Sequence, residues 1–315
     1  MKAFIIQPND AGQRLDRFIK KAVPALPDSL LQRSIRLKRI KLNKKGAKNA
    51  AMLAAGDLVE MYLNDEFFSS KENSPGFLLA GTELAIVYED TNLLLLDKAP
   101  GLVVHEDSFG QPDTLINRVC RYLYEKGEYD PQNEQSFVPA LCNRIDRNTG
   151  GIVIAAKNAP TLRVVNDLIK KRLIDKYYLC MIHGRMTPAQ GTLKQFLLKD
   201  ADENRVEVFD WPVPGAKTAL TRYKTLRSDE KLSLLEVELL TGRTHQIRAS
   251  FAHVGHPLLG DHKYGNSKSN LGTGHRFQAL YAYRLVFNGE SEAEHLAYLN
   301  RREFIIEVPF RNEIK

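Results

Sequence analysis

The sequence predicts an α+β protein with a mixed, largely antiparallel sheet, flanking helices and a second, smaller domain at the N-terminus. Apolar strand patterns recur along the chain with helices scattered between them, and no regular βαβ alternation predicts a parallel sheet. The 315 residues are ample for one large domain and a small one. The net charge of +7 is concentrated at the N-terminal end, which sets that end apart from the rest of the chain.

Composition narrows the class of protein. Hydrophobic residues are 43% and charged residues 26% of the chain, which is typical of a soluble globular protein. No apolar run approaches the length of a membrane span, and the short apolar run within Met1–Pro8 is no signal peptide, so we expect a cytoplasmic protein. The spacing of Cys120, Cys142 and Cys180 indicates neither a disulfide framework nor a zinc site.

The first 64 residues carry their own pattern of elements. Helical spacing of apolar residues predicts a helix over 12–23 and a second, short one over 28–38 that Asp28 would cap. A short strand over 40–42, a turn over 43–46 and a strand over 58–63 follow. Helices, strand, turn and strand in this order are enough for a small α/β domain.

That N-terminal segment is strongly basic. Residues 1–64 hold 13 Lys and Arg against 5 Asp and Glu, a charge of +8, so the remaining 251 residues sum to −1. Six of the basic side chains belong to the second helix, its exit and the turn: Arg33, Arg36, Lys38, Arg39, Lys44 and Lys45. A basic domain on a near-neutral body favours an appendage that binds a polyanion. The alternative is a charged domain that only aids solubility.

The remainder of the chain divides into a linker and a body. Residues 65–80 look like a linker, so the expected domains are 1–64 and 81–315. In the body, strand patterns cover residues 84–88, 93–96, 152–156, 177–182, 235–239 and 304–308. Helices are expected over 113–126, with Asp113 as its cap, and over 161–175.

One acidic residue of the body lies between two arginines. Arg144, Asp146 and Arg147 precede the double glycine Gly150-Gly151 and a buried strand. Opposite charges nearby favour the ionised carboxylate, so Asp146 is a candidate nucleophile or base. The alternative is a structural Arg–Asp pair at the surface.

Three segments together resemble the RluA family of pseudouridine synthases. The family segment H-R-L-D-x-x-T-S-G is matched by Asn143–Gly151, the segment G-R-T-H-Q-I-R by Gly242–Arg248, and D-K-P-x-G-L-x-x-H by Asp97–His105. A G-x-P-x-x-G-D match ends at Asp261. Any one match is weak, but their common order over residues 80–310 is specific. The resemblance implies the pseudouridine-synthase fold with a central cleft, and isomerisation of uridine in RNA without a cofactor.

The resemblance also implies roles for four residues. Asp146 would be the catalytic aspartate, Arg248 the arginine that pairs with it, and Arg144 the arginine that fills the gap left by a flipped base. Tyr178 would contact the uracil and assist proton removal from its carbon five. Tyr177 is its rival, since strand alternation lets only one of the two face the site.

Two positions depart from the family pattern. Asn143 replaces the usual histidine and is expected to support the loop by hydrogen bonds. Gly150 replaces the usual serine, and we expect a more flexible turn there. Both departures bear on substrate preference more than on the activity.

The N-terminal segment has a resemblance of its own, to the RNA-binding domain first named from ribosomal protein S-four. Such domains place a basic helix on the phosphate backbone of structured RNA. The pairing of the two domains favours large-subunit ribosomal RNA as substrate, with transfer RNA as the alternative. A catalytically silent RNA-binding or ribosome-assembly factor is another alternative.

A metal-dependent hydrolase is the remaining rival. His245, His253, His256 and His262 lie close in sequence, but their spacing is not a closed ligand set. We therefore expect no metal, and turn or helix contacts for these histidines.

Overall fold

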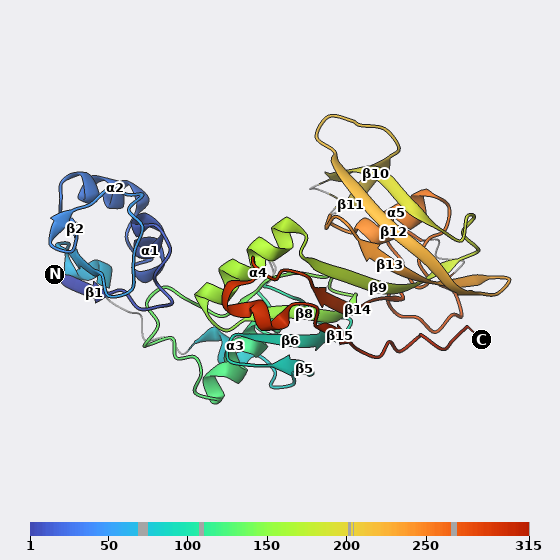
Figure 1. The fold of residues 1–315 in the computed structure, drawn as a ribbon, viewed down its shortest axis with the longest axis horizontal. Helices are drawn as coiled ribbons and strands as arrows, with labels where there is room; N and C mark the ends of the chain where they lie inside the picture. Colours follow the sequence, from blue (N-terminus) through green and yellow to red (C-terminus); the bar gives the residue numbers. More distant parts are fainter. Residues whose placement is uncertain (69–74, 107–109, 201–202, 204, 266–269, 315) are drawn as a thin grey trace.

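The computed structural model describes residues 1–68, 75–106, 110–200, 203, 205–265 and 270–314. The described residues form two sheets. The small sheet belongs to the N-terminal unit at the left of Figure 1, and the large sheet extends through the body from the centre to the right. Among the described residues, no helix is long and apolar enough to cross a membrane.

The N-terminal unit is a four-stranded sheet covered by two helices. Its sheet order is β1-β4-β2-β3. The elements are β1 (Lys2–Ile5), α1 (Leu15–Ala22), α2 (Asp28–Arg36), β2 (Ile40–Leu42), β3 (Lys45–Gly46) and β4 (Leu58–Met61). Leu15, Phe18 and Leu31 are fully buried between the helices and the sheet, so this unit has a core of its own.

Two local details of this unit correct the sequence predictions. Pro27 occupies the N-cap of α2, and Asp28 is the first helical residue, where its carboxylate pairs with Lys20 at 2.7 Å instead of capping the helix. The turn is tighter than expected. Asn43 and Lys44 both have positive φ, at 50° and 65°, which suits a two-residue hairpin turn and lets Lys45 begin β3.

The body is built on a sheet whose order is β11-β10-β12-β13-β9-β14-β8-β6-β5. Its strands are β5 (Ile86–Glu89), β6 (Leu93–Lys98), β7 (Ala140–Leu141), β8 (Gly150–Ala156), β9 (Ile174–His183), β10 (Gln190–Asp200), β11 (Arg205–Phe209), β12 (Lys217–Ser228), β13 (Leu232–Leu239), β14 (Leu280–Phe287) and β15 (Glu303–Ile305). Short strands β7 and β15 pair with β8 and β14. Only the β8–β14 pair is parallel among the described strands of this sheet, which confirms the prediction of a mixed, largely antiparallel α+β fold.

Helices cover both faces of the β6–β8 half. Successive leucines of β6 point to opposite faces, as strand geometry requires. Leu94 and Leu96 join the core beneath α3 (Leu115–Glu125), whereas Leu93 and Leu95 join the core beneath α4 (Ala159–Lys171) and the 3₁₀ helix η3 (Glu294–Leu299). At the other end of the sheet, α5 (Gln246–His253) contacts β10, β11 and β12.

The predicted helices of the body have different ends in the structure. Thr114, not Asp113, caps α3: its hydroxyl accepts the Asn117 backbone N–H at 3.2 Å. Asp113 instead receives the guanidinium of Arg118 at 2.7 Å. Helix α4 ends earlier than predicted because Arg172 takes a left-handed conformation, with φ of 61°, that turns the chain into β9.

The segment predicted as a linker contains two 3₁₀ helices, η1 (Asp65–Phe68) and η2 (Gly76–Leu79). Residues 69–74 of that segment lie outside the described residues. Polar contacts also join the N-terminal unit to the body. The Asn9 amide donates to Glu134 at 2.8 Å and its oxygen accepts the Ala159 backbone N–H at 3.1 Å, at the start of α4.

Candidate active site

Asp146 lies on the segment between β7 and β8, and its neighbours hold that segment to the sheet. The Asn143 oxygen accepts the backbone N–H of Ile154 at 2.8 Å, and its amide donates to the Ile152 carbonyl at 3.4 Å. Asn143 thus supports the loop by hydrogen bonds. The Asp146 side chain is 27% exposed, so a bound molecule can reach it.

Lys98 fixes the turn that follows Asp146. Its ammonium is buried and donates to the carbonyls of Ala99, Leu102 and Arg147, each at 2.9 Å, so the three N–H bonds of the charged form are all used. Burial lowers the pKa of Lys98 to about 7, against the opposing influence of Asp146 and Asp97. Lys98 therefore ties the Asp97–His105 segment to the loop of Asp146.

Arg248, on α5, joins two carboxylates. Its Nη1 lies 2.9 Å from Asp146 Oδ2, while Nε and Nη2 contact both oxygens of Asp261 at 2.7 and 3.0 Å. Burial would lower the pKa of Arg248, but Asp261 and then Asp146 outweigh it and raise the pKa. The same bidentate pair outweighs burial at Asp261 and lowers the pKa of that carboxyl.

Asp261 is a functional candidate that the sequence analysis named only as the end of the G-x-P-x-x-G-D match. It is fully buried and also accepts the backbone N–H groups of Lys263 and Tyr264, at 2.9 and 3.1 Å. A buried carboxylate with these four donors holds Arg248 in one orientation. The sequence offered one signal for this role: Asp261 is an acidic residue thirteen positions after Arg248, in a segment otherwise rich in Gly and Pro.

The two arginines that flank Asp146 in sequence do not contact its carboxylate. Arg147 is exposed, and its Nε donates to the Gly101 carbonyl at 3.2 Å. Arg144 is exposed and makes no hydrogen bond or ion pair within the described part of the chain. The local charge pattern favoured the neighbouring arginines as partners of Asp146, whereas the family resemblance named Arg248, and it is Arg248 that contacts the carboxylate.

Tyr177 and Tyr178 lie on opposite faces of β9. Tyr178 is buried in the core cluster that contains Ile145 and Ile247, whereas Tyr177 packs under the guanidinium of Arg284, 3.6 Å from ring centroid to Cζ. Burial raises the pKa of Tyr178, and the charge of Asp146 raises it further. Of the two rings, Tyr178 is therefore the one on the side of Asp146.

Gly150 is not in a flexible turn, contrary to the expectation from its replacement of serine. It begins β8 and pairs with Tyr281 of β14. A Cβ at Gly150 would lie 2.1 Å from the Tyr281 ring, and one at Gly151 would lie 2.3 Å from the Ala282 carbonyl oxygen. The double glycine is required because β14 approaches the backbone of β8 so closely.

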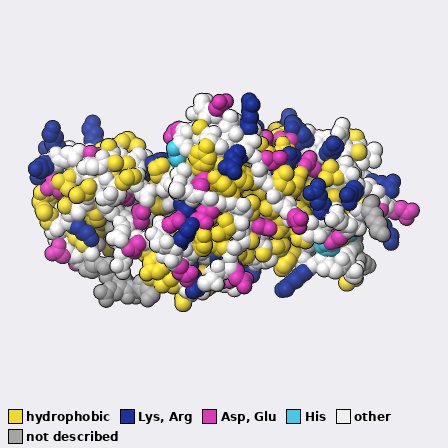
Figure 2. Space-filling model, turned by 60° about the horizontal axis from the view of Figure 1, so that its bottom comes forward, with side chains coloured by type: hydrophobic (Ala, Val, Ile, Leu, Met, Phe, Trp, Pro, Cys, Tyr) yellow, Lys and Arg dark blue, Asp and Glu magenta, His cyan; other side chains and the backbone are white. Residues whose placement is uncertain are grey.

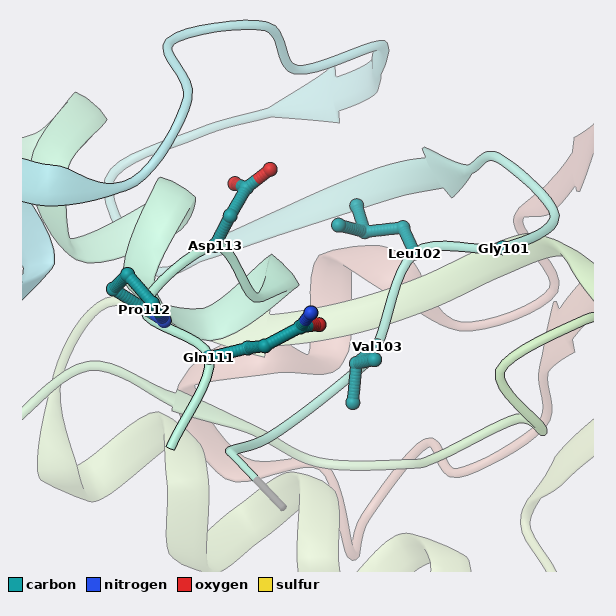
Figure 3. A pocket seen from close by; sticks show the side chains of 6 residues that line it. All are labelled: Gly101, Leu102, Val103, Gln111, Pro112 and Asp113. Carbon is teal, nitrogen blue, oxygen red and sulfur yellow. The ribbon is translucent and has the colours of Figure 1, made fainter. Parts of the chain in front are cut away.

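A hollow of about 280 Å³ adjoins the Asp146 loop. The segments Gly101–Val103 and Gln111–Asp113 line it, and Figure 3 shows the Gln111 side chain extending toward Leu102 and Val103. Gly101 donates its backbone N–H to the Arg147 carbonyl at 2.8 Å, which joins the wall of the hollow to the turn after Asp146.

The histidines of the body have separate contacts. His253 pairs with Asp210 at 3.2 Å, His256 contacts the His183 carbonyl at 2.9 Å, and His245 contacts Tyr264 at 2.8 Å. The described residues contain no group of three or more His, Cys, Asp and Glu side chains that could hold a metal ion.

The six basic residues named from the N-terminal sequence are all exposed on one unit. Arg33, Arg36 and Lys38 also line a hollow of about 770 Å³ with Lys48. Figure 2 shows Lys and Arg side chains at the outer edge of the N-terminal unit, and more of them over the opposite end of the molecule. The positive charge is therefore presented to solvent and separate from the Asp146 site.

A mixed sheet with an aspartate–arginine pair on the β7–β8 segment and α5 is the arrangement expected from the sequence resemblance to pseudouridine synthases. The chain belongs to the RNA pseudouridylate synthase family, whose model matches residues 92–253, and within it to the RluA type. It is therefore an RNA-modifying isomerase that converts uridine to pseudouridine.

Relatives and solved structures agree with this assignment. The chain is 32% identical over 281 residues to the ribosomal large subunit pseudouridine synthase C of Vibrio parahaemolyticus, covering 85% of this chain and 82% of that one. It is 30% identical over 286 residues to the uncharacterized RNA pseudouridine synthase YhcT of Bacillus subtilis, covering 89% and 87%. The structure of human RNA pseudouridylate synthase domain containing 1 shares the fold, with a TM-score of 0.57, 21% identity, and coverage of 78% of this chain and 89% of that one.

Proposed function

We propose that the protein isomerises specific uridines of large-subunit ribosomal RNA, with Asp146 as the catalytic carboxylate. The observation that carries this proposal is the contact of Arg248 Nη1 with Asp146 Oδ2 at 2.9 Å. The arginine favours the ionised carboxylate and fixes its orientation. Within the described residues no hydrogen bond reaches Oδ1, so that oxygen is available to the substrate.

The reaction requires only acid–base or nucleophilic chemistry. The bond from the uracil nitrogen to the sugar breaks, the ring turns, and carbon five bonds to the anomeric carbon. A proton leaves carbon five and another reaches the nitrogen, so substrate and product are isomers and no oxidant or cofactor is needed. Asp146 either attacks the anomeric carbon or removes a ribose proton, and both steps need its ionised form.

Tyr178 has a place in this scheme beside Asp146. Its ring would pack against the uracil, and its hydroxyl would assist removal of the proton from carbon five. Because burial and Asp146 raise the pKa of Tyr178, the free protein holds a neutral phenol. The neutral hydroxyl would take the proton from carbon five only as it gives its own to a base, and the Asp146 carboxylate, whose charge acts on Tyr178, would be that acceptor.

A stacked base cannot reach a partly buried carboxylate, so the target uridine must flip out of its stack. Flipping costs about a few kcal/mol and least in a loop. Arg144 is exposed and lies two residues before Asp146. Its guanidinium would stack on the bases beside the gap.

The substrate assignment depends on the relatives and on the basic unit. Relatives from several Vibrio strains carry the name ribosomal large subunit pseudouridine synthase C. The N-terminal unit, with Arg33, Arg36 and Arg39 exposed, would act as an S-four-type RNA-binding domain on structured RNA. Transfer RNA is the competing substrate.

The test is tritium release from RNA labelled at carbon five of uracil. Unmodified large-subunit ribosomal RNA, small-subunit ribosomal RNA and transfer RNA are compared. We expect release from large-subunit RNA alone. Release only from transfer RNA would overturn the substrate assignment, and tight binding without release from any of the three would identify a silent RNA-binding factor.

A further inference from the structure

A histidine without an assigned role lies beside the Asp146 carboxylate. His245 Nε2 is 3.9 Å from Asp146 Oδ2, and its side chain is only 10% exposed. The residue occupies the N-cap of α5 in a left-handed conformation, with φ of 51° and ψ of 21°. A non-glycine residue held there is strained, and such strain is concentrated at functional sites.

The other ring nitrogen has a partner that decides where the proton lies. His245 Nδ1 is 2.8 Å from the Tyr264 hydroxyl, which already accepts the Val206 backbone N–H at 2.9 Å. Burial raises the pKa of Tyr264, so its hydroxyl keeps its proton. We assign that proton to the hydrogen bond with Nδ1, since the Tyr264 hydroxyl has no other acceptor within the described residues. The imidazole therefore carries its own proton on Nε2, the nitrogen that faces Asp146.

Burial is the main reason that the ring is neutral. Burial lowers the pKa of His245; Asp146 opposes this, Arg248 and Lys263 add to it, and Asp261 opposes it again. Arg205, from β11, and Arg248 lie over the Tyr264 ring, 5.5 and 5.3 Å from its centroid. A neutral imidazole presents an N–H to Asp146 without adding a second full charge beside Arg248.

We propose that His245 is a positioning residue for Asp146: together with Arg248 it holds Oδ2 and leaves Oδ1 directed at the ribose, while Tyr264 fixes the required tautomer. This inference rests on the proposed catalytic role of Asp146. Nε2 lies 3.9 Å from Oδ2 in the free protein, beyond hydrogen-bond length, so this restraint would be completed when the site tightens on the bound ribose, and it would then keep the other oxygen oriented toward the sugar. Loss of one restraint should slow chemistry without weakening the binding of RNA.

Four variants test the inference by single-turnover tritium release. His245→Ala removes the donor, and we expect the rate constant to fall about tenfold or more with the RNA concentration dependence unchanged. His245→Gln keeps an N–H near the position of Nε2 and should retain most of the rate. Tyr264→Phe removes the hydroxyl that selects the tautomer of His245, and its rate constant should lie between those of His245→Ala and His245→Gln. His253→Gln, at the other end of α5 where the histidine pairs with Asp210 on the surface, is the matched control and should match the wild type.

The pH profile separates positioning from a structural role. As pH falls below the ordinary range of histidine, His245 gains a second proton. The imidazolium then withdraws electron density from Asp146, so the wild-type rate should fall. His245→Gln has no such group and should lose this acidic limb. A His245→Ala rate within about twofold of wild type, or an acidic limb unchanged in His245→Gln, would overturn the inference.

A spectroscopic reading does not depend on activity. Nitrogen-15 shifts of the imidazoles report the tautomer, and the His245→Gln spectrum assigns the signal of His245. We expect the Nε2–H tautomer in the wild type and a mixture in Tyr264→Phe. A wild-type Nδ1–H tautomer would contradict the inference even if the proposed function holds, whereas full activity of Asp146→Asn would refute the proposed function and this inference with it.

Discussion

The N-terminal unit and the Asp146 site both depend on arginine side chains, but they use the charge of those side chains in opposite ways. On the N-terminal unit, Arg33, Arg36 and Arg39 are exposed, and none of them makes an ion pair within the described residues. In the site, Arg248 is buried and joins two carboxylates. The first arrangement leaves charge free for a polyanion, and the second uses charge to hold a carboxylate in place.

The difference has energetic consequences that can be measured. Exposed charges act over a Debye length and weaken as salt rises. A buried pair is little screened, and removing one partner leaves an uncompensated buried charge. RNA affinity should therefore respond to salt and to the N-terminal unit, whereas turnover and folding should respond to the site.

The largest expected effect comes from Arg248→Met. Asp261 would be left buried and unpaired, so we expect the free energy of unfolding to fall by about 3–5 kcal/mol. Turnover should fall at least about 10²-fold because Asp146 loses its orientation. Urea unfolding and tritium release measure the two effects.

Arg222→Met is the control, because it removes a surface pair with Glu238. We expect it to lower the free energy of unfolding by less than about 1 kcal/mol. Equal losses of stability in the two variants would contradict the distinction between buried and exposed charge.

The two neighbouring tyrosines of β9 give a matched pair. Tyr178→Phe removes the hydroxyl on the side of Asp146, and we expect the single-turnover rate to fall by about 10²-fold. Tyr177→Phe changes a ring that packs on Arg284 on the opposite face and should leave the rate unchanged. A larger loss in Tyr177→Phe would reverse the assignment of the two rings.

A paired carboxylate elsewhere in the body should set part of the acid stability. Burial would raise the pKa of Glu89, but hydrogen bonds from Lys126, Tyr122 and Lys157 outweigh it and lower the pKa to about 2. Because the folded pKa is depressed, the stabilisation is present above about 4.5 and is lost as pH falls toward 2. Glu89→Gln should remove about 2 kcal/mol at neutral pH and flatten acid unfolding in that window. An unchanged acid transition would show that the network contributes nothing.

The smallest effect is expected at the N-terminal unit. Changing Arg33, Arg36 and Arg39 together to Gln should lower RNA affinity about tenfold at moderate salt and reduce the salt slope by up to about 3. The rate at saturating RNA should not change. The same triple change at Lys170, Lys171 and Arg172, exposed at the end of α4, removes equal charge from the body. An equal fall in the salt slope for both variants would mean that the N-terminal charge has no special place on the RNA.

The sequence predicted local elements better than contacts between distant segments. Helical spacing and apolar runs located α3, α4 and the strands around Asp146, because these patterns are set by neighbours along the chain. The ends of the helices differed, since Thr114 competes with Asp113 for the cap and Arg172 ends α4 by its backbone conformation. Strands β10, β12 and β14 were not anticipated, although residues 217–228 alternate in burial over part of their length.

The site shows the same limit. The motif resemblance named Asp146, Arg248 and Tyr178, which the structure brings to one place from separate parts of the chain. Their neighbours Asp261 and His245 were not anticipated as part of the site, because only folding brings these two side chains beside Arg248 and Asp146. Gly150 was misjudged for the same reason: its need for glycine comes from the Tyr281 ring of another strand.

Asp146→Asn tests the central claim most directly. The substitution keeps the size of the side chain and removes its charge, so we expect tritium release from large-subunit ribosomal RNA to become undetectable. RNA affinity, measured on the same preparation, should remain at the wild-type value because the basic N-terminal unit is intact. Release at the wild-type rate would contradict the account.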